Sequence, residues 1–491
     1  MTAQSAEAKG GFILLIQPKT ALIDIEKSSP ALPLSLLFAS AFLAKIFPFR
    51  LFDERTDGLF DVCIEKLRAN PPLLAGITAI TGRQVGYAEE LARSIRSSLS
   101  VPVVWGGKHA LFFSNELLLA GVADYVVRGD GEKAFLELAC AIRDERDLSN
   151  IQGLSYIVDG QIIEGSIAPH VDLESIDSLP YSMLKHRYLY LKRGVLTGVM
   201  ETSRGCPYRC TFCYNSVGLG SSWRGAGAKW VVERLKELKV ARPQTGHVDF
   251  VDDNFFVDKE RALAIGRAIA SEVRLHFTCN GGRISDLLRY SDDDFNELAR
   301  AGLERVDIGV ETASPKVREL LNKDESVDQV HEVCRKLTRA GVAPWINLMV
   351  GFPDETKEDM AKTARLADEL LALYSPLYLS PIYGYKPYPK TPLFENLRAR
   401  GFELPSDSKM QKTAWSEPHS PWLKRWQKRL IANLYFYSLF MDEKILLYRD
   451  QWWIRVSMKV LIPIARMRVR HLWFCLPVLK WLYNLFRGGD Y

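Results

Sequence analysis

The stretch "ETSRGCPYRCTFCYN", residues 201–215, places three of the chain's eight cysteines within eight residues. Cys206, Cys210 and Cys213 follow an apolar run that predicts a β-strand at 197–203. Thiolates at such short spacing hold zinc or an iron–sulfur cluster. A structural zinc site takes four ligands, and the nearest further cysteine is Cys279, at the end of another predicted strand. Three thiolates on a [4Fe–4S] cluster would leave one iron open, whereas a zinc site completed by a distant residue and three ordinary thiols are the alternatives.

The cysteine motif lies in the first of six strand–helix units. The strands are predicted at 197–203, 247–251, 274–279, 305–310, 345–350 and 377–383. Ser314 followed by Pro315 is typical of a helix start between two of them. Six units over residues 188–395 predict a partial (β/α)6 barrel, and the cysteines stand where such barrels carry their chemistry, after a strand.

Residues 1–150 also alternate strands with helical patterns. The strands are predicted at 12–16, 50–53, 73–78, 101–107 and 124–129. This alternation predicts a parallel sheet covered on both faces, in a Rossmann-like α/β domain. Gly106, Gly107 and Gly129 close two strands, where glycine lets the backbone approach a ligand. Residues 151–187 are predicted to form a hairpin with an Asp159–Gly160 turn, followed by a linker.

The composition is that of a globular protein of two or three domains, with 491 residues and 47% hydrophobic side chains. The polar start lacks the order of a signal peptide, and eight cysteines are too sparse for a disulfide scaffold, which predicts a reducing, cytoplasmic compartment. Residues 396–491 are predicted to be helical, basic and aromatic. From Pro421 to Tyr491 the chain carries 13 Lys and Arg against 4 Asp and Glu, and six of the eleven tryptophans.

The motif C-x3-C-x-aromatic-C, with Phe212 as the aromatic residue, resembles the radical S-adenosylmethionine (radical SAM) superfamily. Further matching segments follow in order: "FVDDNF" (250–255), "GVETAS" (309–314), "VGFPDET" (350–356) and "KPYPKTPLFE" (386–395). In the N-terminal region, "VVWGGKHA" and "ADYVVRGDGE" resemble the cobalamin-binding domain of the B12-dependent branch. That branch includes class B radical SAM methyltransferases and the anaerobic magnesium-protoporphyrin ester cyclases.

The resemblance implies that Cys206, Cys210 and Cys213 hold a [4Fe–4S] cluster, with SAM bound at the open iron. The SAM-binding residues that it implies are Phe212, Asp253, Arg283, Glu311 and Gly351. Glu311 would accept from the ribose hydroxyls, Arg283 would face the carboxylate, Asp253 would contact the amine, and Gly351 would shape the backbone near adenine. The competing interpretations are a surface carboxylate for Glu311 and an ordinary ion pair for Arg283.

The resemblance also implies cobalamin contacts in the N-terminal domain. The residues implied are Thr78, Thr81, Gly106, Gly107, Gly129 and Glu132. The D-x-H-x-x-G signature is absent and His109 does not fit it, so no protein histidine is expected to ligate cobalt. Ser35 stands where the family commonly has glycine. The alternative is a degenerate domain that binds no cofactor.

The function implied is that of a cobalamin-dependent radical SAM C-methyltransferase acting on a small hydrophobic or natural-product substrate. A reduced flavodoxin or ferredoxin would be the electron donor. A radical cyclase or rearranging enzyme is the alternative. A sulfur-inserting enzyme that modifies RNA or protein usually carries a further cysteine set and a small RNA-binding barrel, neither of which is visible. A non-enzymatic metal-binding scaffold is the remaining competitor.

The basic aromatic C-terminal region permits two structural interpretations. Its apolar runs fall short of the length of a spanning helix. A helix lying on the anionic inner face of a membrane fits the mixture of Trp, Tyr, Lys and Arg. A helical cap on the barrel, with its aromatics packed inward, fits it equally. Nucleic-acid binding is not expected, since the rest of the chain is slightly acidic and carries no recognition motif.

Overall fold

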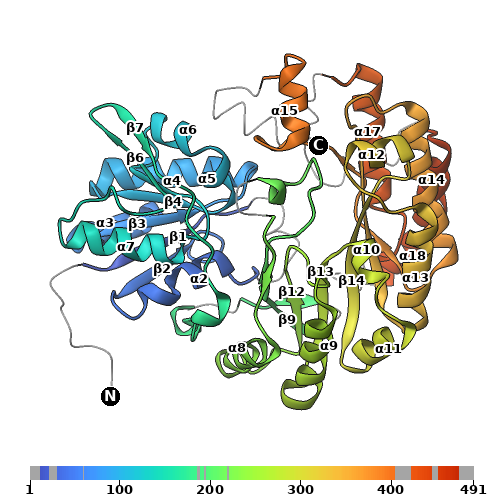
Figure 1. Cartoon of the computed structure of the whole chain (residues 1–491), viewed down its shortest axis with the longest axis horizontal. Helices are drawn as coiled ribbons and strands as arrows, with labels where there is room; N and C mark the ends of the chain where they lie inside the picture. Colours follow the sequence, from blue (N-terminus) through green and yellow to red (C-terminus); the bar gives the residue numbers. More distant parts are fainter. Residues whose placement is uncertain are drawn as a thin grey trace.

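The computed structural model describes residues 11–20, 30–58, 60–184, 188–192, 195–217, 221–403, 422–444 and 452–474. Figure 1 shows an N-terminal α/β domain, a second α/β domain beside it and, on the far side of the second domain, the helices at 425–438 and 452–471. The predicted α/β fold class is therefore confirmed, including a Rossmann-like first domain and a partial barrel.

The first domain is built on a seven-stranded sheet. Its elements are β1 (Ile13–Gln17), α2 (Leu34–Leu43), β2 (Phe49–Asp53), α3 (Asp61–Ala69), β3 (Leu74–Thr78), α4 (Arg83–Leu99), β4 (Val103–Gly106), α5 (Lys108–Phe112), α6 (Ser114–Leu119), β5 (Tyr125–Val127), α7 (Gly131–Arg143), β6 (Leu154–Val158) and β7 (Gln161–Glu164). The strand order is β2-β1-β3-β4-β5-β6-β7, and β1 to β5 are parallel. Because the chain reverses direction across the sheet between β1 and β3, a crevice for a ligand is expected at their carboxyl ends.

Helices cover both faces of this sheet, as the continuous apolar strands require. Helices α2 and α7 pack together on one face, while α3, α4 and α6 supply apolar side chains to the core of the other. The hairpin β6–β7 extends the sheet antiparallel to β5. Asp159 and Gly160 both have positive φ, 49° and 77°, which is the type I′ geometry predicted for an Asp-Gly turn.

The second domain is an open half-barrel. Its strands are β8 (Tyr190–Lys192), β9 (Val195–Met200), β12 (His247–Phe250), β13 (His276–Gly282), β14 (Leu303–Glu311), β15 (Ala343–Val350), β16 (Tyr378–Leu379) and β17 (Tyr383–Gly384), with a small pair β10 (Ser203–Arg204) and β11 (Arg224–Gly225). Its helices are α8 (Ala228–Ala241), α9 (Lys259–Ala268), α10 (Ile284–Leu287), α11 (Asp292–Arg300), α12 (Pro315–Leu320), α13 (Val327–Arg339) and α14 (Lys357–Leu373). From β9 to β16 the neighbouring strands are parallel, and β8 pairs antiparallel at the edge. The expected helix start is present, because Ser314 accepts from the backbone N–H of Val317 and Pro315 is the first helical residue.

The last predicted strand, 377–383, is divided in the structure. Two short strands, β16 and β17, each pair with β15, and Pro381 lies between them. Proline has no N–H to give to a strand ladder, which explains the interruption.

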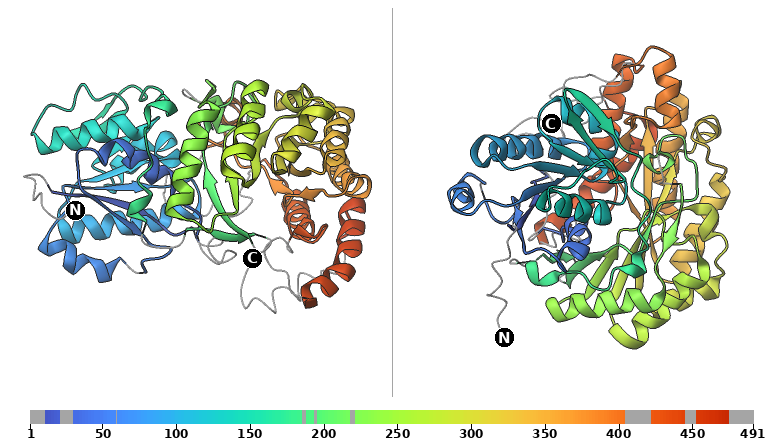
Figure 2. Two further views of the ribbon diagram at one scale, coloured as in Figure 1. Left: turned by 90° about the horizontal axis from the view of Figure 1, so that it is seen from below. Right: turned by 60° about the vertical axis from the view of Figure 1, so that its left-hand side comes forward.

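The C-terminal region is helical where it is described. It contains α15 (Pro392–Ala399), α17 (Arg425–Ser438) and α18 (Trp452–His471). Helix α18 packs against α14 and α17, on the side of the molecule away from the N-terminal domain (Figures 1 and 2). Among the described residues, no helix is long and apolar enough to cross a membrane. Part of the predicted C-terminal helical region, 404–421, 445–451 and 475–491, lies outside the described residues.

Candidate functional site

The three clustered thiols lie on a loop that leaves the carboxyl end of β9. Cys206, Cys210 and Cys213 are partly buried, and each cysteine lies within electrostatic reach of the other two. The loop is anchored by Thr211, whose N–H and hydroxyl donate to the carbonyls of Leu321 and Leu320 at 3.1 and 2.7 Å. Burial, reinforced by the neighbouring thiols, raises the pKa of Cys213 to about 12. Burial also raises the pKa of Cys206. Clustered thiolates repel one another unless a bound cation compensates their charge.

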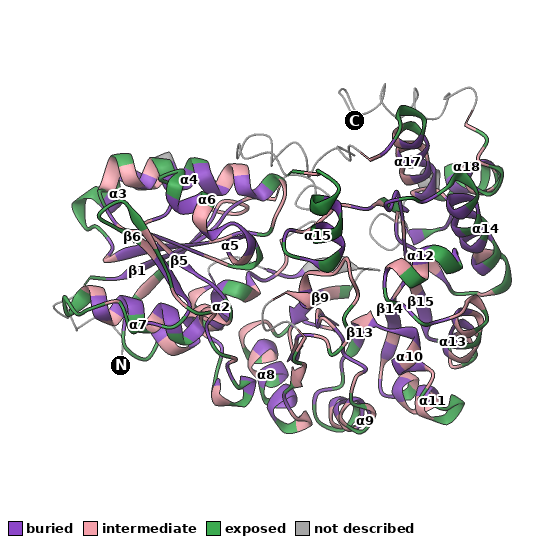
Figure 3. Ribbon diagram, turned by 45° about the horizontal axis from the view of Figure 1, so that its top comes forward, coloured by how far each residue is buried: buried purple, intermediate pink, exposed green. Residues whose placement is uncertain are grey.

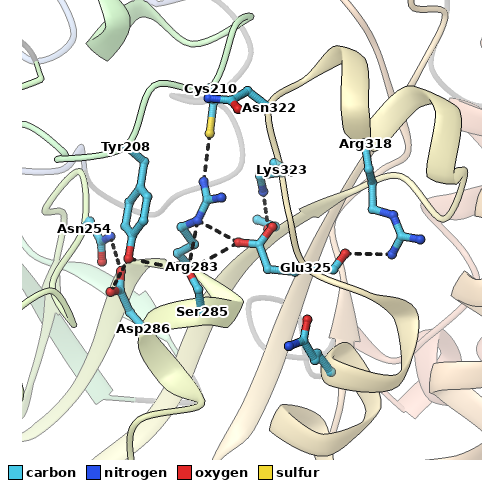
Figure 4. A network of polar contacts seen from close by, with 12 residues as sticks. Tyr208, Cys210, Asn254, Arg283, Ser285, Asp286, Arg318, Asn322, Lys323 and Glu325 are labelled. Atoms are coloured by element: carbon cyan, nitrogen blue, oxygen red, sulfur yellow. Dashed lines mark hydrogen bonds and ion pairs between the residues drawn. The ribbon is translucent and has the colours of Figure 1, made fainter.

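Hydrogen-bond donors point at two of these sulfurs. Nη1 of Arg283 lies 3.0 Å from Sγ of Cys210, and Nδ2 of Asn254 lies 3.9 Å from Sγ of Cys206. Figure 4 shows Arg283 between Cys210 and Glu325, whose carboxylate lies 2.6 Å from Nε, while the guanidinium lies over the ring of Tyr208. Donors directed at sulfur favour thiolates over thiols.

The donor set fits an iron–sulfur cluster. Within the described part of the chain, no three His, Cys, Asp or Glu side chains meet as they would around a single metal ion. Ligands of a multi-iron cluster each bind a different iron and therefore lie farther apart than the ligands of one ion. Cys279, the nearest further cysteine in sequence, is fully buried in the core of the barrel. The structure thus brings three cysteine sulfurs together, with hydrogen-bond donors directed at two of them.

Glu311 ends β14 in an unusual backbone conformation, with φ of 64°. Its side chain is buried, and Oε1 lies 3.3 Å from Nζ of Lys323. The strand shifts register between Gly309 and Glu311, which turns the carboxylate at the strand's end. A non-glycine residue held at positive φ is a sign of a position that the fold imposes.

Gly351 lies in the turn after β15, with φ of 87°. Its N–H donates to Oε2 of Glu355, and its carbonyl accepts from Nε1 of Trp422 at 3.0 Å. An added Cβ would meet Cδ1 of Ile431 of α17 at 2.7 Å, so this close contact and the positive φ both favour glycine. Phe212 packs on the neighbouring Phe352, with ring centroids 6.3 Å apart.

Two residues near this turn were not anticipated as site residues. Glu355 and Trp422 both contact Gly351. Glu355 lies within the matching segment 350–356, whereas nothing local in the sequence marks Trp422. Thr356 and Asp359 form a capping box at the start of α14.

Asp253 follows β12 and stands between the two domains. It accepts from the backbone N–H of Gly205 at 3.0 Å and from the hydroxyl of Tyr214. Burial opposes its ionisation, but the Lys108 ammonium and these hydrogen bonds hold the pKa of Asp253 below its ordinary value. The ammonium of Lys108 lies 4.2 Å from the centre of the Tyr214 ring. Asp253 is therefore an anion whose partners come from both domains.

A cavity of about 380 Å³ opens between the N-terminal sheet and the cysteine loop. On the N-terminal side, its walls include five of the six residues for which cobalamin contacts were predicted, namely Thr78, Gly106, Gly107, Gly129 and Glu132. The sixth, Thr81, is absent from the lining, and its hydroxyl lies 3.3 Å from Nδ1 of His109. Ser35, Tyr214 and Asp253 also line the cavity.

Two strand-end glycines in the cavity wall have positive φ and leave no room for a side chain. Gly107 and Gly129 have φ of 87° and 102°. A Cβ at Gly107 would lie 2.9 Å from Oγ1 of Thr78, and a Cβ at Gly129 would lie 2.7 Å from the carbonyl oxygen of Ala168.

A buried ionic network closes one side of the cavity. Arg204 of the barrel pairs with Glu132 and Asp130 of the N-terminal domain at 2.7 and 3.5 Å, and with Glu201 at 2.7 Å. Arg224 also pairs with Asp130. Oε2 of Glu132 and Nε of Arg224 are buried without a hydrogen-bond partner among the described residues. Buried polar atoms left in this way fit a ligand that supplies the missing contacts.

Comparison with known proteins places residues 200–367 in the Radical SAM superfamily model. The chain is 29% identical over 394 residues to an uncharacterized methyltransferase of Pyrococcus horikoshii, covering 78% of this chain and 82% of that protein. It is 27% identical to the anaerobic magnesium-protoporphyrin IX monomethyl ester cyclase of Cereibacter sphaeroides, covering 71% of this chain but only 57% of that protein. Among solved structures, the cobalamin-dependent S-adenosylmethionine radical enzyme OxsB with aqua-cobalamin bound matches with a TM-score of 0.72 at 16% identity. The match covers 98% of this chain and 76% of OxsB, and it shows that the two share a fold.

Proposed function

We propose a function for this chain on the premise that it belongs to the radical SAM superfamily, whose family model matches residues 200–367. The chain is a cobalamin-dependent radical SAM enzyme, and within that group a C-methyltransferase. Its substrate is a small hydrophobic or natural-product molecule with an unactivated C–H bond. A reduced flavodoxin or ferredoxin supplies electrons.

One observation carries this proposal. The cavity lined by the glycine-rich strand ends of the N-terminal sheet also reaches Tyr214 and Asp253. Tyr214 directly follows Cys213, so a ligand on the N-terminal sheet and a group held by the three cysteines would be neighbours. The same fold in OxsB supports the assignment, because that protein binds cobalamin as well as SAM.

When bound, the cluster would supply the electron that cleaves SAM to a 5′-deoxyadenosyl radical, and a corrinoid would supply the methyl group. The chain's residues bind and orient these groups. Cys206, Cys210 and Cys213 hold the cluster, and Arg283 and Asn254 donate hydrogen bonds toward sulfur.

The remaining residues position SAM and exclude water. Glu311 accepts from the ribose hydroxyls, and Asp253 presents a carboxylate to the amine from between the domains. Phe212 and Phe352 shield the turn at Gly351 from water. The guanidinium of Arg283 contacts Glu325 and Cys210. It would therefore divide its N–H groups between these two residues and the SAM carboxylate.

On the other side of the cavity, the N-terminal domain holds the corrinoid. The strand-end surface against it is formed by Thr78, Gly106, Gly107 and Gly129. Oε2 of Glu132, which has no hydrogen-bond partner among the described residues, accepts a hydrogen bond from the corrinoid. His109 is directed to Thr81 and stacks on Phe113, so it is occupied within its own domain.

The first experiment tests the cofactors. Chain purified without oxygen and with added hydroxocobalamin should retain iron, sulfide and corrinoid, and should release 5′-deoxyadenosine from SAM when reduced. Cys210→Ala should lose the cluster and this product. The matched control is Cys334→Ala, since Cys334 is buried in α13 away from the site and should keep both. A zinc-loaded wild type that forms no 5′-deoxyadenosine would overturn the proposal.

A second experiment separates methyl transfer from the alternative. A radical cyclase is favoured by the 27% identity with the porphyrin ester cyclase. Reduced holoenzyme is incubated with SAM carrying a trideuterated methyl group, and its corrinoid is then analysed by mass spectrometry. A methyltransferase loads the label onto cobalt, whereas an unlabelled corrinoid together with 5′-deoxyadenosine favours the cyclase.

A further inference from the structure

The inner face of helix α18 packs against α14 and α17. Ala465 and Val469 are buried against the rest of the molecule. Arg466 pairs with Asp368 of α14 at 2.6 Å, and Arg468 donates to the hydroxyl of Tyr437 on α17 at 3.0 Å. The helix is therefore a cap on α14 and α17, and this face needs no other partner.

The outer face of α18 is apolar, and among the described residues nothing covers it. Val456, Val460, Pro463 and Met467 are exposed, and their spacing of four, three and four residues places them on one stripe. The exposed fractions are 55% for Val456, 62% for Val460 and 41% for Met467. Trp473, just beyond the helix, is 47% exposed. Figure 3 shows α18 at the edge of the molecule, with exposed residues along it.

Cations border this stripe, and one of them, Arg470, also pairs with Asp368 of α14 at 3.2 Å. The helix contains five Lys and Arg and neither Asp nor Glu. Arg455, Lys459 and Arg470 are exposed beside the apolar side chains. An interfacial helix has this composition, with an apolar face for acyl chains, basic residues for anionic headgroups and tryptophan at the boundary.

We propose that the outer face of α18 docks the protein on an anionic lipid bilayer, with the helix axis in the plane of the surface. A second copy of the chain is a worse occupant, because a symmetric contact through the same stripe would set the basic residues of one copy against those of the other. The basic surplus from Pro421 onward, 13 Lys and Arg against 4 Asp and Glu, adds attraction toward an anionic surface. The inference does not depend on the proposed function.

The test is co-sedimentation of the full chain with vesicles of phosphatidylcholine alone or with about one third phosphatidylglycerol. The protein should bind the anionic vesicles at least about tenfold more tightly than the neutral ones, and high salt should release it. Val460→Glu, in the middle of the stripe, should lower the bound fraction by about tenfold. The matched control is Val240→Glu, since Val240 is 83% exposed on α8, and it should bind like the wild type.

Three outcomes would overturn the inference. The first is equal binding to both vesicle types, or no binding to either. The second is an equal loss of binding in Val460→Glu and Val240→Glu. The third is a dimer in gel filtration that Val460→Glu dissociates without vesicle binding, which would assign the stripe to a second copy. If Val460→Glu fails to fold, Lys459→Glu, at an exposed position, tests the dependence of vesicle binding on positive charge instead. No outcome depends on iron, corrinoid or turnover, so the proposed function can fail without affecting the result.

Discussion

At the scale of single residues, Glu355 shows how the fold changes the chemistry of a side chain. Its carboxylate lies behind the turn after β15, where Oε2 accepts from the backbone N–H groups of Gly351 and Phe352. Oε1 is buried without a hydrogen-bond partner in the described structure. Burial raises the pKa of Glu355 to about 8 despite these two hydrogen bonds.

Glu355 therefore makes stability depend on pH. Because its pKa is about 8 in the folded chain and 4.5 in the unfolded one, the folded state binds more protons between these values, and stability falls as pH rises. Glu355→Gln keeps an acceptor for the two N–H groups and removes the titration. We expect its melting temperature to fall less than that of the wild type between about pH 5 and pH 8.

The measurement is thermal denaturation of both proteins across this pH range. Glu358→Gln is the control, because Glu358 lies at an exposed position in the first turn of α14 and its substitution should leave the pH profile unchanged. Parallel profiles for Glu355→Gln and the wild type would show that Glu355 has an ordinary pKa.

At the scale of elements, the ends of the N-terminal strands determine what the cavity can hold. The backbone of Gly129 forms a bridge with Ala168 of the linker, and its φ of 102° is one that side chains rarely adopt. Together with the hydrogen bonds from the N–H of Ala168 to the carbonyl of Arg128 and from the N–H of Val171 to Asp130, this bridge joins the end of β5 to the segment leading toward the barrel.

We expect Gly129→Ala to be clearly more destabilising than a substitution at a glycine that also has positive φ but has free space around it. The new Cβ would lie 2.7 Å from the carbonyl oxygen of Ala168 and force the backbone apart. Gly121→Ala is the matched control, because Gly121 has φ of 64° with nothing within 4 Å and should cost only about 1 kcal/mol. Melting temperature and retained corrinoid are measured for both, and only Gly129→Ala should lose corrinoid. Similar losses in the two variants would contradict a role for the strand end.

At the scale of the whole molecule, the two domains share a core and a charge network. Apolar residues of α2, α7 and the linker belong to the same buried cluster as the barrel. Arg204 connects the cysteine loop to Glu132 and Asp130 across the domain boundary. The side chains of Arg204 and Glu132 are 13% and 5% exposed, so solvent screens their interaction little.

Removing the charge of Arg204 should loosen the two domains. Arg204→Gln leaves Glu132 and Asp130 buried with a partner missing, at a cost of about 3–5 kcal/mol. We expect a lower melting temperature and faster proteolysis of the segment after β7. Lys236→Gln is the control, because the pair of Lys236 with Glu272 is about half exposed and should contribute less than about 1 kcal/mol. If calorimetry and proteolysis find the two variants alike, the network does not hold the domains together.

The sequence predicted those features that depend on neighbouring residues. The five N-terminal strands, the Asp159–Gly160 turn and the strand before Cys206 follow from local apolar patterns, turn chemistry and spacing. Strand-end glycines such as Gly107 were assigned to a ligand surface, and they line the cavity. The strand at 377–383 was the exception, because the pattern concealed the break at Pro381.

Long-range packing decided the rest. No sequence pattern predicts that Arg204 pairs with Glu132, that Glu355 is buried, or that Asp253 interacts with Lys108 of the other domain. The choice between a cap and an interfacial helix at the C-terminus also needed the structure, because only α14 and α17 distinguish the covered face of α18 from the open one. Local sequence sets backbone geometry and side-chain chemistry, whereas burial and charge pairing depend on residues that only the folded chain brings together.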